Sequence, residues 1–508
     1  MRNFKLFLVV VITILGLGWR LYHIEFGLPH SFHADEPEIA ELAIKYTFEL
    51  KDIVKNNSYY KLVPVSYVYG TFPAYFFTAV TMLYSKTNNL LGNTFSKTDL
   101  YIFMRSVNAL LAFVIAPLSV VLYYKLFKDK FGTVFVFFLT ALNWKLIVHA
   151  HYINADIMLT VILSALYLVA YFYFCSATPN TKTKYTILLG LLFGLAVGTK
   201  ITATLILPLF VFLYIRKKDY LGLLGLLLVA LATFMVTNPF SVIFYRDFIF
   251  RMYQLQFREN GLVFDSADLS VTKYIFALGF IATPLILAAS LYGKWTLIKN
   301  KVIESKDYHI FLAGNVFMYL VFFTLGSRKV DRWLLPILPI VLIYGVYGIS
   351  QMRNYLLTTV TGGAYLVFPI LLLLQFQQQT PKSAAYLWMQ QNTSDLATKY
   401  VVTEEGLDPM NKLPRASVHQ FEVYESKGAQ LAYPPNPLLY DYVVLSSKPM
   451  DYYKNPIVQK RFPNYFERWN NFEKTVMDPN QFELIQEYVL PKPNLVNLSD
   501  VYIYKKLY

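Results

Sequence analysis

The stretch of sequence that decides the fold reads FKLFLVVVITILGLGWRL at residues 4–21, and HADEP follows it at residues 33–37. An apolar run of about 20 residues is long enough to cross a bilayer as a helix. Ionisable groups near lipid are costly, so they tend to be paired or functional. We therefore expect Asp35 and Glu36 to lie where one end of a membrane span meets water. Chemistry at a bilayer surface is the hypothesis that follows.

Apolar stretches of similar length recur along most of the chain. Of its 508 residues, 56% are hydrophobic and only 15% are charged, which is typical of a multi-pass membrane protein. About eleven stretches have a length suited to a membrane helix. The predicted spans are Phe4–Tyr22, Leu100–Leu122, Phe131–His149, Ile157–Phe174, Tyr185–Gly198, Ile201–Tyr214, Leu221–Thr237, Tyr274–Leu291, Ile310–Gly326, Leu334–Ile349 and Tyr355–Leu374. The expected fold class is a multi-pass α-helical membrane protein.

The net charge of +14 belongs entirely to the apolar part of the chain. From Phe376 onward, 14 Lys and Arg balance 14 Asp and Glu. Basic residues of the earlier part fall on alternate connections, such as Lys125–Lys130 and Arg216–Lys218, which indicates orientation in a membrane and not nucleic-acid binding. The basic connections are then expected in the cytoplasm, and Asp35 on the opposite side. The single cysteine, Cys175, excludes an internal disulfide and a cysteine-based zinc site.

Two parts are expected: a membrane domain at residues 1–375 and a small extracytoplasmic α/β domain at residues 376–508. The first outer loop, residues 25–99, is too long for a simple connector and is predicted to be functional. It is expected to hold a surface helix capped by Asp35 and a second amphipathic helix at Pro73–Leu91. In the C-terminal part we predict a helix at Ser383–Asn392 and strands at Tyr400–Thr403, Asp441–Leu445 and Val501–Tyr504.

The acidic candidates each have a structural and a functional interpretation. Asp35 and Glu36 at a helix N-terminus would be kept ionised, which suits a base that takes a proton from a hydroxyl. Asp156 also opens a predicted helix, so both aspartates could instead be simple caps. His149 and His151 shortly precede Asp156, which leaves a divalent metal ion open as a cofactor, although the spacing matches no strong zinc signature.

Several basic residues lie on the predicted outer side, against the usual distribution of positive charge. They are Lys200, Arg246, Arg251, Arg258 and Arg332. A phosphate group would explain them, because lysine and arginine bind phosphate through charge-assisted hydrogen bonds. The alternative is ion pairing between sequence neighbours, such as Arg246 with Asp247 or Asp331 with Arg332. The sequence shows no P-loop, GxGxxG, nucleophile elbow or Asp-x-Asp motif, and the predicted cytoplasmic connections are too short for a nucleotide site.

A series of short motifs runs through residues 1–340 in a fixed order. They are Phe32–Glu36, Tyr69–Pro73, Arg105–Leu110, Asp156, Gly194–Lys200, Thr237–Pro239 and Arg332–Pro336. In this order and spacing the chain resembles the GT-C superfamily of integral-membrane glycosyltransferases. It is most similar to the family-39-like branch that contains protein O-mannosyltransferases and lipid A aminoarabinose transferases.

This resemblance implies a polyprenyl-phosphate sugar donor, an acceptor on a protein, glycolipid or glycan, and reaction outside the cytoplasm. A bacterial or archaeal plasma membrane is the expected location. The resemblance makes Asp35 the base that activates the acceptor hydroxyl, while Glu36 and Asp156 orient the substrates. The residues expected to bind the donor phosphate are Lys200, Arg251, Arg258 and Arg332. Further substrate contacts are expected from His33, Tyr69 and His151.

Two functions of other classes compete with this interpretation. A secondary transporter or flippase of a lipid-linked or anionic substrate should show a repeated half and charges near the bilayer midplane. The sequence shows no repeat, and its acidic candidates lie at span ends. A scaffold anchored in the membrane is the other alternative, although about eleven spans exceed what an anchor needs.

Overall fold

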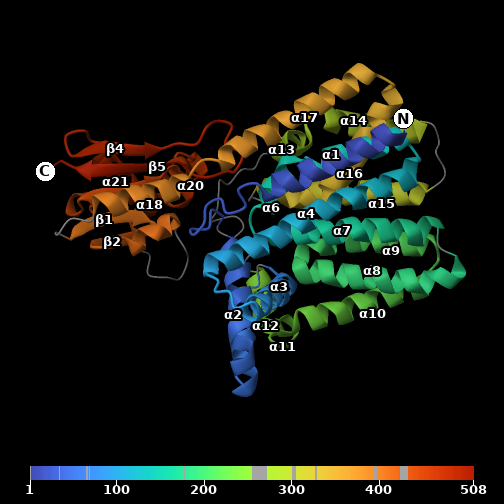
Figure 1. Ribbon diagram of the computed structural model, residues 1–508, viewed down its shortest axis with the longest axis horizontal. Helices are drawn as coiled ribbons and strands as arrows, with labels where there is room; N and C mark the ends of the chain where they lie inside the picture. Colours follow the sequence, from blue (N-terminus) through green and yellow to red (C-terminus); the bar gives the residue numbers. More distant parts are fainter. Residues whose placement is uncertain are drawn as a thin grey trace.

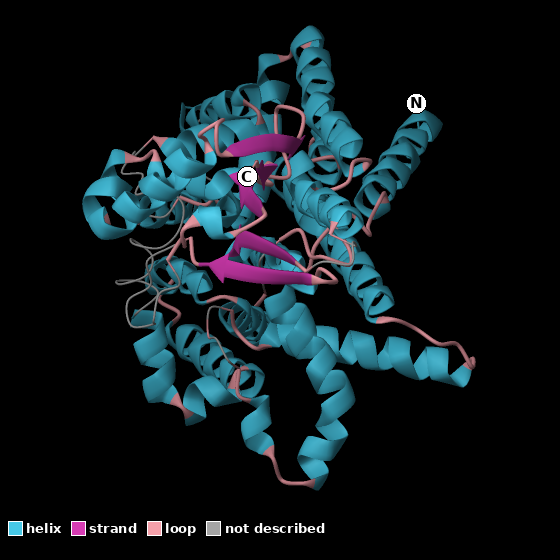
Figure 2. Cartoon of the chain, turned by 90° about the vertical axis from the view of Figure 1, so that its left-hand side faces the viewer, coloured by secondary structure: helices cyan, strands magenta, loops and turns pink. Residues whose placement is uncertain are grey.

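The structure is a computed structural model that describes residues 2–33, 35–64, 67, 69–176, 178–253, 272–299, 305–326, 329–393, 398–423 and 433–507. A bundle of helices makes up most of the chain, and a small sheet lies at one end of the bundle (Figure 1). The N-terminus lies at the opposite end. We term these two ends the sheet end and the N-terminal end. Figure 2 views the molecule from the sheet end, with the strands in front of the helices.

The bundle is built from long apolar helices and from helices broken into two pieces. The long helices are α1 (Arg2–Leu21), α4 (Lys97–Phe127), α7 (Ala155–Tyr171), α8 (Pro179–Thr199), α10 (Tyr220–Thr237), α15 (Lys306–Leu325), α16 (Leu338–Met352) and α17 (Tyr355–Phe376). The shorter pieces are α5 (Lys130–Ala141), α6 (Trp144–Ala150), η3 (Ile201–Ile206), α9 (Leu207–Arg216), α11 (Pro239–Ile243), α12 (Tyr245–Tyr253), α13 (Lys273–Ala282), α14 (Pro284–Lys299) and η5 (Asp331–Ile337).

The described residues contain six helices long and apolar enough to cross a membrane, or up to eight if each bent pair is one span. All the predicted spans are helical, but some are not single straight helices. The α5–α6 pair bends by 44° where Asn143 caps a new helix by accepting the backbone N–H of Leu146. The α13–α14 pair bends by 102°, because Thr283 has a φ of 74° and Pro284 follows it. Ile201–Arg216 is a shorter apolar helix.

The long first loop contains two further helices, α2 (Glu36–Lys55) and α3 (Phe72–Leu90), as predicted. α2 runs across the direction of the bundle helices instead of along it (Figure 1). One face of α2 buries Ile39, Ala43 and Tyr46, while Phe48 remains exposed. The hydroxyl of Thr47 contacts that of Thr81 on α3, so the two helices form one unit. This amphipathic arrangement suits a helix at a membrane surface.

The C-terminal residues form a five-stranded sheet in the order β2-β1-β3-β5-β4. β1 is parallel to β2 and β3, while β5 is antiparallel to β3 and β4. The elements are α18 (Pro381–Asn392), β1 (Lys399–Glu404), β2 (Ala416–Phe421), β3 (Tyr442–Ser446), α19 (Ser447–Tyr453), α20 (Pro456–Arg461), α21 (Pro463–Val476), β4 (Phe482–Tyr488) and β5 (Val501–Lys506). The predicted helix and three predicted strands are present, and β2 and β4 are additional.

The sheet domain is fastened to the bundle at the end of α17. Gln375 there donates its side-chain amide to the carbonyl of Pro493 at 2.5 Å and accepts the backbone N–H of Leu495 at 3.0 Å. Leu490 and Val496 pack into the same hydrophobic core as the bundle helices. The segment before β5 therefore joins the domain to the sheet end of the bundle.

α14 packs closely against α16 because glycine, which has no side chain, stands at the contact. A Cβ atom at Gly348 would lie 1.9 Å from the carbonyl oxygen of Ala289, whereas one at Gly363 on α17 would meet nothing within 4 Å. We expect Gly348→Ala to lower the free energy of unfolding by about 1–3 kcal/mol, because overpacking forces the helices apart. Thermal unfolding in detergent measures this change.

Gly363→Ala is the matched control, since alanine relieves the helix-propensity cost of glycine without a clash. It should leave the unfolding temperature unchanged or slightly raised. Equal unfolding temperatures for the two variants would contradict the close contact of α14 with α16.

Candidate active site

Four charged side chains that are distant in the sequence meet at the sheet end. Asp35 comes from the loop between α1 and α2, and Asp156 from the first turn of α7. Lys200 follows the last residue of α8, and Arg332 lies in η5. We term these four residues the charged site. All four were predicted from the sequence, and the ends of separate helices bring them together.

Arg332 links the two aspartates of the charged site. Its Nη2 atom contacts Oδ2 of Asp35, and its Nε atom lies 3.2 Å from Oδ2 of Asp156. Lys200 completes the arrangement, with Nζ 2.6 Å from Oδ1 of Asp156. Two carboxylates therefore face two cations, and the site is formally neutral. The side chain of Asp35 is 22% exposed and that of Asp156 only 2%, so Asp35 is the acid open to a second reactant.

The ion pair between Arg332 and Asp156 contains two polar atoms that form no hydrogen bond among the described residues. Among the described residues, neither Nε of Arg332 nor Oδ2 of Asp156 has a hydrogen-bond partner, although both atoms are buried. Buried polar atoms without partners are rare and call for an explanation. These two atoms face each other 3.2 Å apart as an ion pair that lacks hydrogen-bond geometry.

The expected capping roles of the two aspartates are wrong. Asp35 occupies the N-cap position of α2, but its side chain accepts no capping hydrogen bond because it turns to Arg332. α7 is capped by Asn154, whose side-chain oxygen accepts the backbone N–H of Ile157 at 3.0 Å. Asp156 is one residue inside the helix and points to Lys200 and Arg332.

Ion pairing of Asp331 with its neighbour Arg332 does not form either. Nζ of Lys145 on α6 lies 2.6 Å from Oδ2 of Asp331, and Arg332 turns instead to the charged site. Lys145 was missed in the sequence because it stands inside an apolar predicted span. Arg246 donates from Nε to the hydroxyl of Tyr245 at 3.2 Å. The structure thus separates the pairs that sequence adjacency suggested.

Two aromatic residues surround Asp35. The hydroxyl of Tyr69 donates a hydrogen bond to its carboxylate, and Nζ of Lys200 lies 5.8 Å from the Tyr69 ring. The His33 ring stacks on Tyr152 with centroids 4.1 Å apart, and its Nε2 atom lies 3.2 Å from Nη1 of Arg332. The predicted residues His33 and Tyr69 therefore belong to the site. Tyr152, whose ring stacks on that of His33, was not singled out from the sequence.

The surroundings of Asp35 keep its carboxylate ionised. Burial raises the pKa of Asp35, but the charges of Arg332, His33 and Lys200 and the hydrogen bond from Tyr69 together outweigh burial. The pKa of Asp35 consequently lies below its ordinary value. Burial and the Asp35 carboxylate raise the pKa of Tyr69 well above its ordinary value, so its hydroxyl stays neutral and donates.

Glu36 lies beside the charged site but is fully buried in an ion pair with Arg105 of α4. Its two oxygens accept from Nε and Nη2 of Arg105 at 2.7 and 2.6 Å, and also from the hydroxyl of Ser31 and the backbone N–H of Ile153. Arg105 also donates to the carbonyl of Phe26 at 2.8 Å. Glu36 therefore fixes the loop that carries Asp35, and its oxygens are already engaged.

The two histidines before Asp156 point in different directions. His151 is buried, and its ring nitrogens lie 2.8 Å from the carbonyls of Ile147 and Tyr22. His149 contacts the hydroxyl of Tyr152 through Nδ1. The described part of the chain holds no group of three His, Cys, Asp or Glu side chains that could bind a metal ion. His151 thus joins α1 to α6 and lies outside the charged site.

The arginines of the loop after α11 are not part of the charged site as the structure describes it. Arg251 is exposed on α12. Arg258 lies outside the described residues. α12 nevertheless reaches the first loop, because the ring of Phe248 packs edge-on against Tyr67 with centroids 5.7 Å apart.

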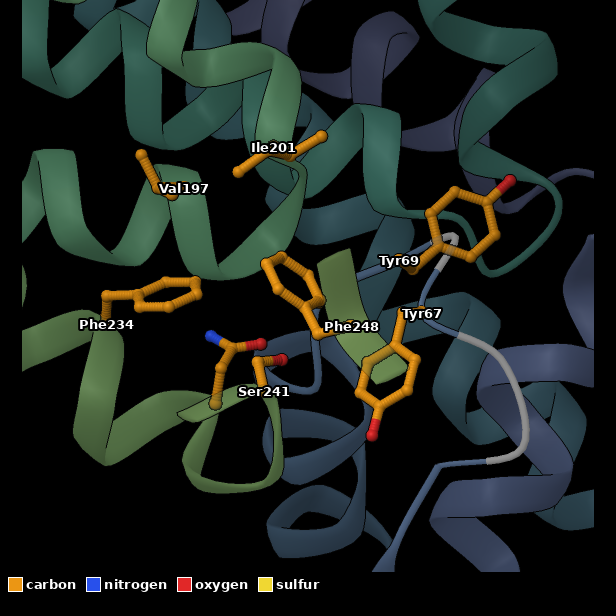
Figure 3. A pocket seen from close by; sticks show the side chains of 9 residues that line it. Tyr67, Tyr69, Val197, Ile201, Phe234, Ser241 and Phe248 are labelled. Atoms are coloured by element: carbon orange, nitrogen blue, oxygen red, sulfur yellow. The ribbon is translucent and has the colours of Figure 1, made fainter. Parts of the chain in front are cut away.

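A small pocket lies between this helix and the residues that flank Lys200 (Figure 3). It is lined mostly by apolar and aromatic side chains, with Ser241 and Asn238 as polar members. The lining residues are Tyr67, Tyr69, Gly70, Val197, Ile201, Phe234, Asn238, Ser241 and Phe248. Because Tyr69 also contacts Asp35, the pocket and the charged site share a wall.

Comparison with known proteins agrees with this architecture. Residues 77–249 match a family model described as dolichyl-phosphate-mannose-protein mannosyltransferase. A search of curated protein sequences finds no match. The chain is similar to the crystal structure of ArnT from Cupriavidus metallidurans bound to undecaprenyl phosphate. The identity is 14%, the TM-score is 0.54, and 97% of each chain is covered.

The chain is also similar to the apo crystal structure of the Archaeoglobus fulgidus oligosaccharyltransferase. The identity is 13% and the TM-score is 0.55, over 96% of this chain and 80% of that chain. At such identities the likeness is one of fold. Together with the family model, it supports a membrane glycosyltransferase in general terms. The predicted resemblance to the GT-C superfamily is confirmed, by sequence over residues 77–249 and by fold over nearly the whole chain.

Proposed function

We propose that this protein transfers a sugar from a polyprenyl-phosphate donor to an acceptor hydroxyl, with Asp35 as the base. The observation that carries the proposal is the charged site itself. An ionised and partly exposed carboxylate lies beside two buried cations, next to an apolar pocket. A base, an anion site and a place for a lipid chain are the parts that such a reaction needs.

The cations are suited to the phosphate of the donor. Lys200 is 8% exposed, and Arg332 has a buried Nε atom without a hydrogen-bond partner. Cations in so dry a site attract an anion more strongly than they would in water. A structure of the same fold contains undecaprenyl phosphate, which supports a lipid phosphate as the ligand. We place the phosphate end of the lipid chain beside the apolar side chains of Val197 and Phe234, which line the small pocket.

The reaction is a displacement at the anomeric carbon of the donor sugar. The acceptor oxygen forms a bond to that carbon, and the bond from the carbon to the phosphate oxygen breaks. The acceptor proton passes to Asp35, and polyprenyl phosphate leaves with the electron pair. Because phosphate is a competent leaving group, no general acid is required.

Arg332 must loosen its hold on Asp35 before Asp35 can accept a proton. In the ligand-free site one arginine serves both aspartates. A bound phosphate competes for the same guanidinium, so its arrival weakens the contact with Asp35. Donor binding would therefore convert Asp35 from an ion-pair partner into a base.

The other predicted residues take supporting roles in this proposal. Asp156 holds Lys200 and Arg332 at the phosphate, and Glu36 fixes the Asp35 loop through Arg105. His33 and Tyr69 orient the Asp35 carboxylate. His151 acts from a distance by joining α1 to α6. Arg251 and Arg258 remain predicted contacts of the phosphate, and Arg258 lies outside the described residues.

The charge pattern supports an orientation in which the sheet end is extracytoplasmic. On this proposal residues 1–375 are the catalytic membrane domain and residues 376–508 an outer domain, in a plasma membrane. Acceptors on a protein, a glycolipid or a glycan all supply the hydroxyl that the mechanism needs. A lipid carrier brings the sugar to that side, and the sequence shows no P-loop or GxGxxG motif for a nucleotide.

The donor class is tested with purified protein reconstituted in liposomes. We expect sugar transfer from a panel of labelled polyprenyl-phosphate sugars and none from the corresponding nucleotide sugars, because the cations lie beside an apolar pocket. Release of polyprenyl phosphate should accompany each transfer. Transfer from nucleotide sugars alone would refute the proposal. Movement of the labelled lipid across the bilayer without transfer would favour a flippase.

Asp35→Asn should lower the turnover number by about 10²–10⁴-fold, since the amide keeps the shape but cannot accept the proton. Its affinity for undecaprenyl phosphate should remain, because Lys200 and Arg332 are still present. Asp52→Asn, an exposed acid on α2, is the matched control. Near-normal turnover of Asp35→Asn would exclude Asp35 as the base.

The pH dependence reports on the link between Arg332 and Asp35. The depressed pKa of Asp35 keeps the base form present at low pH, so the acid limb of kcat/KM should lie below the ordinary pKa of an aspartate. In Arg332→Gln the positive charge that lowers the pKa of Asp35 is lost. Burial, which raises that pKa, is then less opposed, and the pKa of Asp35 rises. The residual activity should then fall off at a pH about one unit higher or more. Tyr69→Phe should shift the limb less and in the same direction, and an unmoved limb in both variants would contradict the link.

A further inference from the structure

Three short uncharged stretches meet directly behind the charged site. Gly70–Thr71 leads into α3, Gly198–Thr199 ends α8, and Thr237–Asn238 lies at the end of α10. We term this meeting point the clasp. Each stretch belongs to a motif that the sequence analysis singled out, yet the mechanism above uses none of their uncharged residues. Figure 3 shows the surroundings of the clasp, with Tyr69 and Ser241 on either side of Phe248 at the pocket.

Asn238 is the central side chain of the clasp. Its Oδ1 atom accepts the backbone N–H of Thr71 at 2.7 Å and the Thr71 hydroxyl at 3.2 Å. Its Nδ2 atom donates to the carbonyl of Gly198 at 3.3 Å. The Thr71 hydroxyl also donates to the carbonyl of Thr237 at 2.5 Å. One amide therefore ties together the first loop, α8 and α10.

The backbones in the clasp approach so closely that only glycine fits. The backbone N–H of Gly70 donates to the carbonyl of Thr199 at 3.1 Å. A Cβ atom at Gly70 would lie 1.8 Å from the carbonyl oxygen of Gly198. A Cβ atom at Gly198 would lie 2.6 Å from Nδ2 of Asn238. These contacts leave no room for the loop and the helix end to shift independently.

The residues next to the clasp are those that contact the aspartates. Tyr69 immediately precedes Gly70 and donates to Asp35, while Lys200 immediately follows Thr199 and pairs with Asp156. Asn238 is only 1% exposed, and it lines the pocket beside both. We propose that Asn238 is a positioning residue that sets Lys200 for the donor phosphate and Tyr69 for the Asp35 carboxylate. This inference rests on the function proposed above.

A purely structural asparagine would behave differently from a positioning one. The side-chain hydrogen bonds of Asn238 reach the segments that carry Tyr69 and Lys200, whereas Asn315, also fully buried, donates to the carbonyl of Phe311 within its own helix. Loss of Asn238 should therefore act through Lys200. Loss of Asn315 should act on stability alone. This contrast makes Asn315→Ala the matched control.

The test measures binding of undecaprenyl phosphate to the full-length protein in phosphatidylcholine nanodiscs. We expect Asn238→Ala to weaken binding about tenfold, which corresponds to one misplaced charge-assisted hydrogen bond. Gly70→Ala should weaken binding to a similar extent through its clash. In Lys200→Ala,Asn238→Ala, binding should be no weaker than in Lys200→Ala alone, because Asn238 acts through Lys200.

Thermal unfolding of each variant shows whether the protein is folded, and Asn315→Ala should bind within about twofold of the unaltered protein. Normal binding by a folded Asn238→Ala, while Lys200→Ala binds weakly, would overturn the positioning role and leave the proposed function intact. Additive losses in the double variant would also overturn the role. Normal binding by Lys200→Ala would instead refute the phosphate site, and the inference with it.

Discussion

The shared guanidinium of Arg332 is the interaction on which the rest of the site depends. It faces Asp35 and Asp156 at once, and removing it would leave two carboxylates near each other with Lys200 alone. Charges buried beside a membrane are tolerated only when they are paired. The ends of α7, α8 and η5 must therefore meet at one point, and the loop that carries Asp35 must reach the same point. The charges can therefore be paired only if the helices are arranged so that these ends meet.

Much of the fold follows from the apolar runs, because length and hydropathy determine where a chain can cross lipid. The breaks in these runs do not follow. Asn143 starts a new helix within an apolar stretch, and Thr283 turns the chain before Pro284, so the two predicted spans bend by 44° and 102°. Strand β4 has the sequence FELIQEY, in which polar and apolar residues mix without strict alternation, so the sequence suits several exposed structures equally well. Only its pairing with β5 selects a strand.

The charged residues of the site could be predicted because each lies at an end of a predicted apolar span or in the loop next to it. Their partners could not be predicted. Asp331 and Arg332 are adjacent in sequence, but Asp331 pairs with Lys145 while Arg332 pairs with the two aspartates of the charged site. The direction of each side chain depends on local backbone geometry, which the sequence does not show. Glu36 looked equivalent to Asp35, and only the fold shows that Arg105 occupies it completely. Tyr152 and Asn238 carry no charge, so their positions in the site emerge only when distant segments meet.

Neutrality in the ligand-free state has a consequence for the order of events. The two aspartates of the charged site are balanced by Lys200 and Arg332, so an entering phosphate adds a negative charge that must take a cation from a carboxylate. Asp156 is almost completely buried and has Lys200 as a second partner. Breaking its ion pairs would therefore cost more free energy than breaking the pair of Arg332 with Asp35. Asp35 is partly exposed, and water or an acceptor hydroxyl can replace the arginine. On the proposed function, the phosphate releases the carboxylate that faces the acceptor, and donor binding and preparation of the base are then the same step.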